Sequence, residues 1–376
     1  MIKEETDRLL GGRSRSSYIN DVLRLVKIKT YKDRERMRCP ENLIVLRNGI
    51  LDLKKMELKP FTPDIFVLNQ LPVYFDPNAD CPNIKKFISE VVSPADAMVL
   101  QELTGYCLWR RYPIHKAFML LGEGRNGKTT FLNTLKALLG EENISAIALQ
   151  DLSNRFAAAD LYGKLANICD DISDRDLRNT SRFKELTGES FIRAERKFRP
   201  PFYFVNSAKL IFSANKLPRS SDDTNAFFSR WIIIPFPNKF EEGVNADPDL
   251  LEKLTTPQEL SGFLNWALKG LQRLRKNGKF SYSKTVNQVR AYMIKLSDSV
   301  LAFINERIVF DPKNEIPKQR LYSEYVAYCK NEQLVAVDYQ TFCKRVLRTR
   351  RVSETRPMMQ GKRIQCFKGL RLKRRP

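Results

Sequence analysis

The stretch FMLLGEGRNGKTTFLNTLKALLG, residues 118–140, decides the fold of this chain. Its first four residues are apolar and predict a buried strand, while the apolar residues after position 130 recur at helical spacing. Between them, GEGRNGKT has the form GxxxxGK followed by Ser or Thr, in which the glycines let backbone N–H groups face a phosphate. The motif requires a strand before it and a helix after it, and both are predicted. We therefore expect a nucleotide site here rather than a structural glycine turn.

The loop and the start of the helix offer three kinds of phosphate contact. Lys128 places a positive charge near the β- and γ-phosphates, the Thr129 hydroxyl can ligate Mg²⁺, and the helix adds the positive end of its dipole. A nucleoside triphosphate and Mg²⁺ are the expected cofactors. The expected nucleotide-binding residues are Gly122, Glu123, Gly124, Arg125, Asn126, Gly127, Lys128, Thr129 and Thr130.

Polar residues also flank three other strand-like segments. Asp170 and Asp171 end LANICDD, where one acid would hold the water shell of the metal and the other would orient the attacking water, unless they form a solvated turn. Asn215 ends LIFSAN and can sense the γ-phosphate, although asparagine often ends strands without such a role. Arg230 precedes WIIIPF and suits a finger that reaches a neighbouring subunit's nucleotide, or a surface arginine. The candidate catalytic residues are Lys128, Asp170, Asp171, Asn215 and Arg230, and the candidate metal ligands are Thr129 and Asp170.

Strands alternate with helices through the middle of the chain, which predicts a three-layer α/β domain with a mainly parallel sheet. Residues 1–38 have helical character, Asn48-Gly49 indicates a hairpin, and residues 84–108 show helical spacing. Residues 245–285 look helical and connective. We expect a small N-terminal α/β module over 1–110, the three-layer domain over 111–284, and a C-terminal domain over 285–376.

The composition favours a polyanion as the partner. The 376 residues carry a net charge of +22, and residues 344–376 alone hold 13 Lys or Arg against one acid. Such an excess attracts nucleic acid or an anionic membrane, and the lack of an amphipathic membrane helix beside this tail favours nucleic acid. No apolar run approaches the ~20 residues of a membrane span, and no signal peptide is recognisable, so we expect the chain to stay in the compartment where it is made.

The seven cysteines form no CxxC pair, and the chain has one histidine, His115, so the usual zinc sites are excluded. Reduced structural thiols are expected, with His115 as a packing or surface residue.

The segment RAERKFRPPFYF combines cations with aromatic residues, which is typical of nucleic-acid surfaces. We expect a basic loop that faces DNA through Arg193, Arg196, Lys197 and Arg199. The aromatic residues Phe198, Phe202 and Tyr203 are expected in the core rather than stacked on bases.

The C-terminal domain shows the pattern of a winged helix. Three helical segments precede a hairpin expected around Gln360-Gly361, and the third helix groups the cations Lys344, Arg345 and Arg348. These are the second set of candidate DNA-binding residues, and the alternative is a solvated basic tail.

The order of these motifs resembles that of superfamily 3 helicases of the AAA+ class. More narrowly, it is similar to the helicase half of the primase–helicases of phages, plasmids and nucleocytoplasmic DNA viruses. The motifs are GxxNGKT, ANICDD, FKELTGES with RAERKF, KLIFSANKLP and SRWIIIPF, and the segment beginning VLRNGILDLKK resembles the module that precedes the helicase in that family. Together they cover residues 40 to 240.

The resemblance implies a homo-hexameric ring that hydrolyses ATP between subunits and moves single-stranded DNA through its pore in the 3′→5′ direction. It also implies that the N-terminal module is an oligomerisation collar. The implied roles are phosphate and Mg²⁺ binding for Lys128 and Thr129, the Walker B pair for Asp170 and Asp171, the sensor for Asn215, the finger for Arg230, and the pore hairpin for Lys197. The second Walker B acid is often Glu in the family, so the division of roles between Asp170 and Asp171 stays open.

The sequence thus leads us to expect an ATP-dependent replicative DNA helicase that binds single-stranded and duplex DNA. No primase or polymerase domain precedes residue 1, so we expect a truncated form or a stand-alone helicase, with a primase or polymerase fused upstream or acting in trans. The expected location is the cytoplasm of a prokaryotic host or a viral replication site, with no membrane partner. The alternative is a DNA-binding initiator or loader that uses ATP as an assembly switch, and a packaging or RNA motor is a third option.

Overall fold

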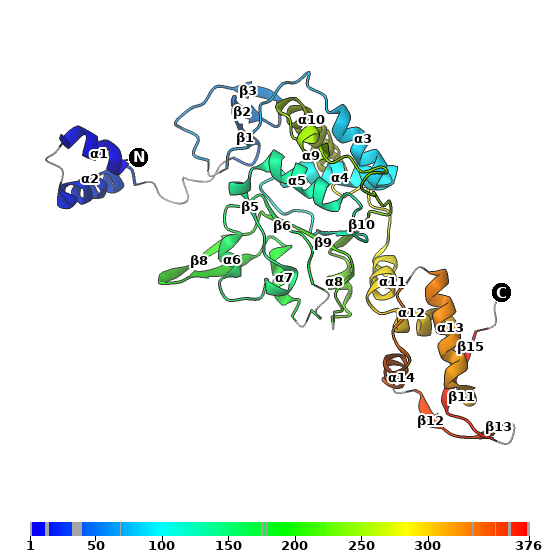
Figure 1. The fold of residues 1–376 in the computed structure, drawn as a ribbon. Coiled ribbons are helices and arrows are strands. Elements are labelled where there is room, and N and C mark those ends of the chain that lie inside the picture. The colour runs from blue at the N-terminus through cyan, green and yellow to red at the C-terminus, as the bar shows by residue number, and fades with distance from the viewer. Residues whose placement is uncertain are drawn as a thin grey trace.

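The structure is a computed structural model. It describes residues 2–11, 15–31, 40–67, 69–173, 176–177, 179–220, 222–332, 334–349, 351–359 and 362–373. Figure 1 shows a large central body, an N-terminal helical pair and a C-terminal domain. No helix in these ranges is long and apolar enough to cross a membrane. Six cysteines are described and all are free, Cys39 lies outside the described residues, and His115 is exposed.

A five-stranded parallel sheet forms the centre of the body, in the order β10-β4-β9-β6-β5. Its strands are β4 (Ala117–Leu121), β5 (Ile144–Ser145), β6 (Ala166–Cys169), β9 (Lys209–Ala214) and β10 (Trp231–Pro235). Every residue of β4 and β9 is buried, as expected for strands that are covered on both faces.

Two hydrophobic cores, one on each face, make the domain three-layered. Phe118 and Leu120 of β4 contact the first core, whereas Met119 and Leu121 contact the second. The first contains residues of α3 (Pro82–Val91), α4 (Pro94–Cys107), α5 (Lys128–Leu139), α9 (Leu250–Leu254) and α10 (Pro257–Asn277). The second contains residues of α6 (Ala157–Asp160), α7 (Ser181–Leu186), α8 (Asn225–Phe228) and α11 (Val286–Ser297). The expected three-layer α/β domain is confirmed.

The helix α10 confirms that residues 245–285 are largely helical, but it corrects the expectation that they are connective. It is 21 residues long, capped by Thr256 and ended by Gly278 in the left-handed conformation. It packs closely on α4, because a Cβ at Gly105 would lie only 2.3 Å from the carbonyl oxygen of Ala267. The helix is therefore a main component of the first core.

The N-terminal region begins with α1 (Ile2–Leu10) and α2 (Ser16–Lys29), which stand apart from the central body in Figure 1. An antiparallel sheet follows, formed by β1 (Leu43–Leu46), β2 (Gly49–Asp52) and β3 (Glu57–Lys59). The pairing of Leu46 with Gly49 confirms the hairpin expected at Asn48-Gly49. Leu46 and Leu51 of this sheet are in the first core, together with α3 and α4.

The C-terminal region has its own third core, which includes Phe303, Tyr325, Phe342 and Phe367. Its elements are α12 (Ser299–Arg307), β11 (Ile308–Pro317), α13 (Lys318–Asn331), α14 (Tyr339–Leu347), β12 (Ser353–Thr355), β13 (Met358–Met359), β14 (Lys362–Arg363) and β15 (Cys366–Leu372). The strand β11 lies between α12 and α13, a strand that the expected order of three helices and then a hairpin did not include. Together with β12 and β15, which follow α14, it forms an antiparallel sheet of order β11-β15-β12. The expected turn at Gln360-Gly361 lies outside the described residues.

The helix α11 differs in its packing from the rest of the C-terminal region. Val289 and Met293 lie in the second core of the central domain, whereas the residues of the third core begin at Val300 in α12. A deletion that starts at residue 285 therefore removes part of the central domain's core, and a deletion from Ser299 does not.

Short elements complete the fold. They are two 3₁₀ helices, Glu141–Asn143 and Leu149–Asp151, and the hairpin strands β7 (Phe191–Arg196) and β8 (Arg199–Val205).

Candidate nucleotide site and basic surfaces

The loop between β4 and α5 has the shape of a phosphate cradle. Gly127 has φ +86° and precedes α5, whose first turn receives no side-chain cap, so its N–H groups can bind a ligand. A Cβ at Gly127 would lie 2.6 Å from Val91, and one at Gly122 would lie 2.0 Å from the Asn126 amide. A Cβ at Gly124 would meet nothing within 4 Å, so only the two motif glycines are required by the loop's packing.

Lys128 lies inside this cradle and is only 5% exposed. Its Nζ donates to the Gly122 carbonyl at 2.5 Å, to Asn126 Oδ1 at 3.0 Å and to Asn215 Oδ1 at 3.1 Å. All of these acceptors are uncharged, and none of the described carboxylates forms an ion pair with Lys128. Burial lowers the pKa of Lys128, while the nearby Asp170 and Asp171 act to raise it. A buried ammonium with only neutral contacts fits a phosphate as its missing counter-charge.

The candidate residues Asp170 and Asn215 gather at the same edge of the sheet as the loop. β4, β9 and β6 are neighbours, and their carboxyl ends are followed by Gly122, Asn215 and Asp170. At this edge the backbone N–H of Gly122, after β4, donates a 3.3 Å hydrogen bond to the carbonyl of Ala214 in β9. Asp170 is half-buried and Asp171 is exposed with φ +52°, so the two acids have different surroundings.

The donor set near the loop suits Mg²⁺ held together with phosphate oxygens. No group of three or more His, Cys, Asp or Glu side chains able to hold a metal ion occurs within the described ranges. Mg²⁺ usually keeps several waters and takes one or two protein oxygens plus phosphate. The Thr129 hydroxyl, which is exposed at the start of α5, and the Asp170 carboxylate would supply such a pair.

Arg230 lies at the opposite edge of the sheet from the loop. It directly precedes β10, whose five residues pair in parallel with β4, so a distance of roughly 17 Å along the strand separates it from the loop's edge. Its Nε donates to Thr187 Oγ1 at 3.0 Å, and its Nη1 donates to the Ala226 carbonyl. Burial lowers the pKa of Arg230. The structure therefore does not bring Arg230 to the nucleotide site of its own chain.

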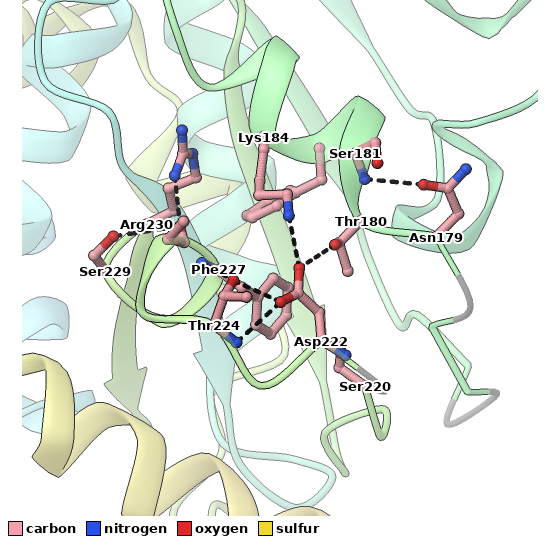
Figure 2. A network of polar contacts seen from close by, with 12 residues as sticks. Asn179, Thr180, Ser181, Lys184, Ser220, Asp222, Thr224, Phe227, Ser229 and Arg230 are labelled. Carbon is pink, nitrogen blue, oxygen red and sulfur yellow. Dashed lines mark hydrogen bonds and ion pairs between the residues drawn. The ribbon is translucent and has the colours of Figure 1, made fainter.

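A network of polar contacts holds the segment that precedes Arg230 (Figure 2). Asp222 accepts hydrogen bonds from Thr180, from Lys184 at 2.9 Å and from the Thr224 hydroxyl at 2.6 Å. Burial alone would raise the pKa of Asp222, but these hydrogen bonds outweigh it and hold the pKa far below its usual range. Thr224 also caps α8, which leads into Arg230. The carboxylate thus ties α7 to the turn that carries Arg230.

The basic segment 193–203 forms a two-stranded hairpin, as the resemblance implied for Lys197, rather than the basic loop expected from the local pattern. β7 and β8 pair from Phe191–Val205 to Arg196–Arg199, and Figure 1 shows the hairpin extending from the body. Lys197 and Phe198 make its tip, where Phe198 is fully exposed. Arg193 pairs with Glu195 at 2.6 Å, and Arg196 lies over the Phe202 ring. Arg199 is exposed.

The aromatic side chains of this hairpin also differ from expectation. Phe198 and Tyr203 are exposed rather than in the core, whereas Phe202 is half-buried and packs on Tyr162. The reason is the alternation of a two-stranded ribbon, because only the face with Ile192, Ala194 and Phe204 contacts the domain.

The three cations expected on the third C-terminal helix, α14, do not lie together. Lys344 and Arg348 are exposed. Arg345 is only 20% exposed at its side chain, and its Nη1 lies 3.2 Å from Asp298 Oδ1. Arg345 also lines a cleft of about 980 Å³ that includes Gly122 and Asn215. Sequence analysis missed Asp298, and it missed the cleft residues of α11 and the C-terminal region other than Arg345, because nothing in the local pattern indicates a contact between α14 and a residue 47 positions away.

The chain matches known protein families and is similar to a protein that is named as a helicase. Three family models match the chain: "D5 N terminal like" over residues 2–93, a family of unknown function over 120–230, and "Poxvirus D5 protein-like" over 295–349. The protein of Acanthamoeba polyphaga mimivirus named "Putative helicase L207/L206" is 27% identical over 328 residues, covering 77% of this chain. The chain spans about a third (34%) of the length of that relative.

Two solved structures of the C-terminal region of NrS-1 in its apo form are also similar. One covers 94% of this chain and 90% of its own, at 14% identity and a TM-score of 0.45. The other covers 78% and 77%, at 14% identity and a TM-score of 0.42. Models of both D5 families thus match on either side of the phosphate loop, and the helicase-named relative aligns with 77% of this chain, which supports a relation to the primase–helicases of viruses and phages.

Proposed function

We propose that the chain is the motor of an ATP-dependent replicative DNA helicase of superfamily 3, with an AAA+ central domain. The observation that carries this proposal is Lys128, a buried ammonium with neutral contacts only, between a phosphate loop and Asn215 on the adjacent strand. The strand order supports this proposal, because Asn215 and Asp170 follow β9 and β6, the two strands beside β4 on one side, where a bound γ-phosphate would be attacked.

The residues around the loop divide the chemistry of hydrolysis between them. The loop N–H groups and Lys128 bind the phosphates, Asn215 positions the terminal phosphate or the water, and Asp170 or Asp171 orients the attacking water. Mg²⁺, when bound at Thr129 and Asp170, neutralises charge that develops on the phosphate oxygens. Arg230 acts on the nucleotide of a neighbouring subunit, because Arg230 and the phosphate loop of the same chain lie at opposite edges of the sheet.

Assembly and DNA contacts follow from the same arrangement. A cation that acts between subunits requires a closed assembly, and we propose a homo-hexameric ring with the β7–β8 hairpin in its pore. Lys197 and the exposed Phe198 at the tip would contact the phosphates and bases of single-stranded DNA, which moves 3′→5′. The C-terminal helices and the β11-β15-β12 sheet would act as a winged helix on duplex DNA, with Lys344 and Arg348 towards the phosphates.

The direct test is ATP hydrolysis by the parent, by Lys128→Ala and by the matched control Lys136→Ala. Lys136 lies on the same helix eight residues later, about 12 Å along its axis, and its Nζ donates to Asn133 Oδ1 at 3.3 Å. We expect Lys128→Ala to hydrolyse ATP at background rate and Lys136→Ala to behave like the parent. Hydrolysis by Lys128→Ala at the parent's rate would refute the motor assignment. The rival function, an initiator or loader without unwinding, predicts the same hydrolysis result but no strand displacement.

A further inference from the structure

The cleft at the phosphate loop has a second wall, which α11 and the C-terminal region supply. One side is formed by Gly122 and Asn215, and the other by α11, by Val335 and by Arg345 of α14. Its volume of about 980 Å³ is at the upper end of the range for small-molecule sites, ~300–1,000 Å³. The C-terminal domain therefore lies across the side of the cleft that faces away from the loop.

The cleft is strongly cationic. Five Lys or Arg residues and two acids are among its lining residues. Lys295 is neutralised within the C-terminal region, because its Nζ lies 2.6 Å from Glu332 and 3.8 Å from Glu306. Arg219 and Arg345 are not fully neutralised, because the two arginines share one carboxylate, that of Asp298.

The carboxylate of Asp298 lies beside both arginines, and Arg219 is held in addition by a 3.2 Å hydrogen bond from its Nε to the Ser297 carbonyl. The Oδ1 of Asp298 accepts from Arg345 Nη1 at 3.2 Å, and its Oδ2 lies 3.8 Å from Arg219 Nε. Asp298 also caps α12 by accepting the N–H groups of Val300 and Leu301. Arg219 and Arg345 line the cleft, but Asp298 does not. One acid against two guanidinium groups leaves a surplus positive charge that faces the cleft.

We propose that Arg219 and Arg345 form a second phosphate-binding position for the nucleotide held by the loop, so that the C-terminal domain closes the nucleotide site. This inference rests on the proposed function, since it needs a nucleotide at Lys128. Guanidinium groups that are fixed by a carboxylate bind phosphate oxygens with little loss of side-chain entropy. Arg219 follows Asn215 by four residues, so the two sides of the cleft meet near the expected terminal phosphate.

Closure of this kind links the nucleotide to DNA. If contact with Arg345 tightens nucleotide binding by a certain free energy, then a bound nucleotide stabilises the closed position of the C-terminal domain by the same free energy. The exposed Lys344 on α14 and Arg348 directly after it would move with Arg345.

The test compares Arg345→Ala with Lys344→Ala in the full chain. The two changes remove equal charge from adjacent positions of one helix. Affinity for a fluorescent ATP analogue with Mg²⁺ and affinity for duplex DNA without nucleotide are both measured. We expect Arg345→Ala to weaken nucleotide binding roughly tenfold, as for a lost charge-assisted hydrogen bond, with duplex binding unchanged. We expect Lys344→Ala to weaken duplex binding alone.

Two further variants guard against misfolding. Asp298→Asn keeps a good helix cap but loses the charge that positions both arginines, and Arg219→Ala removes the other cation. Both should weaken nucleotide binding, with thermal unfolding transitions like the parent's. Equal nucleotide affinity of the parent and the three variants, while Lys128→Ala has lost binding, would overturn this inference but leave the proposed function intact. Loss of duplex binding by Arg345→Ala, with nucleotide affinity unchanged, would return Arg345 to the DNA surface. Nucleotide binding that is absent in the parent, or unaffected by Lys128→Ala, would remove the proposed function itself.

Discussion

Replacement of Arg230 by alanine tests whether catalysis depends on a neighbouring subunit. In the folded chain the guanidinium makes two hydrogen bonds to neutral groups, Thr187 Oγ1 and the Ala226 carbonyl. Their loss costs about 1–2 kcal/mol of stability, which is small against the ~5–15 kcal/mol of a typical domain. The variant should therefore fold. Its nucleotide affinity should match the parent's, because roughly 17 Å of strand separate Arg230 from its own loop.

The rate of ATP hydrolysis should fall by a factor of roughly 10³ or more, the range found when an arginine finger is removed. The matched control is Arg290→Ala. Arg290 also holds the α8 region, by donating to the Asp223 carbonyl and lying over the Phe228 ring, but it has no proposed catalytic role. Hydrolysis by this control should stay near the parent's rate.

A mixture of Arg230→Ala and Lys128→Ala subunits distinguishes the two sides of an interface. Some mixed rings pair an intact Lys128 with an intact Arg230 from the next subunit, so hydrolysis should partly recover. Subunit exchange must be shown separately, for example by transfer of a fluorescent label. Mixed rings without any recovery would place Arg230 in its own subunit's site or outside catalysis.

Three other predictions address DNA and stability. Lys197→Ala should abolish unwinding but keep duplex binding. Deletion of 299–376 should weaken duplex binding and flatten the dependence of duplex affinity on salt concentration. An unchanged slope of affinity against salt after this deletion would exclude a C-terminal DNA-binding domain. Lys209 is fully buried against two tyrosine rings, and burial lowers its pKa to about 7, so the unfolded chain binds more protons above pH 7. The stability of the parent relative to Lys209→Met should therefore rise with pH, by up to ~1.4 kcal/mol per unit between pH 7.5 and 9, and denaturant titrations that show a constant difference would contradict this. Glu102→Ala should lower the free energy of unfolding by about 3 kcal/mol, because it leaves the cation of Arg273 without its buried partner, and an unchanged denaturation midpoint would show that the pair contributes nothing.

The parts of the fold that could be predicted are those that depend on residues close together in the sequence. The strands β4, β9 and β10 are continuous apolar runs, and the loop motif carries its own strand and helix, so a parallel sheet with a phosphate loop followed from local pattern. Asn215 was expected at the site because it ends a buried strand, and the structure brings it to Lys128.

The incorrect or missing predictions depend on contacts between distant segments. The local pattern predicted a basic loop where β7 and β8 pair with each other, and Pro200 and Pro201 lie in β8 because a two-stranded ribbon tolerates missing N–H groups. The burial of α10 comes from its packing on α4, more than 150 residues earlier. The Arg345 side chain is half-buried beside Asp298, whereas Lys344 and Arg348 are exposed, and composition alone could only count Arg345 and Asp298 as charges.

The central claim, that this chain is a motor that unwinds DNA, is tested most directly by strand displacement. The substrate is a duplex with a 3′ single-stranded tail, with a 5′-tailed duplex of equal length as the control. With ATP and Mg²⁺ the parent should release the strand from the 3′-tailed duplex only, and Lys128→Ala should release none. Binding and ATP hydrolysis by the parent without any strand release would contradict the claim and favour the initiator or loader.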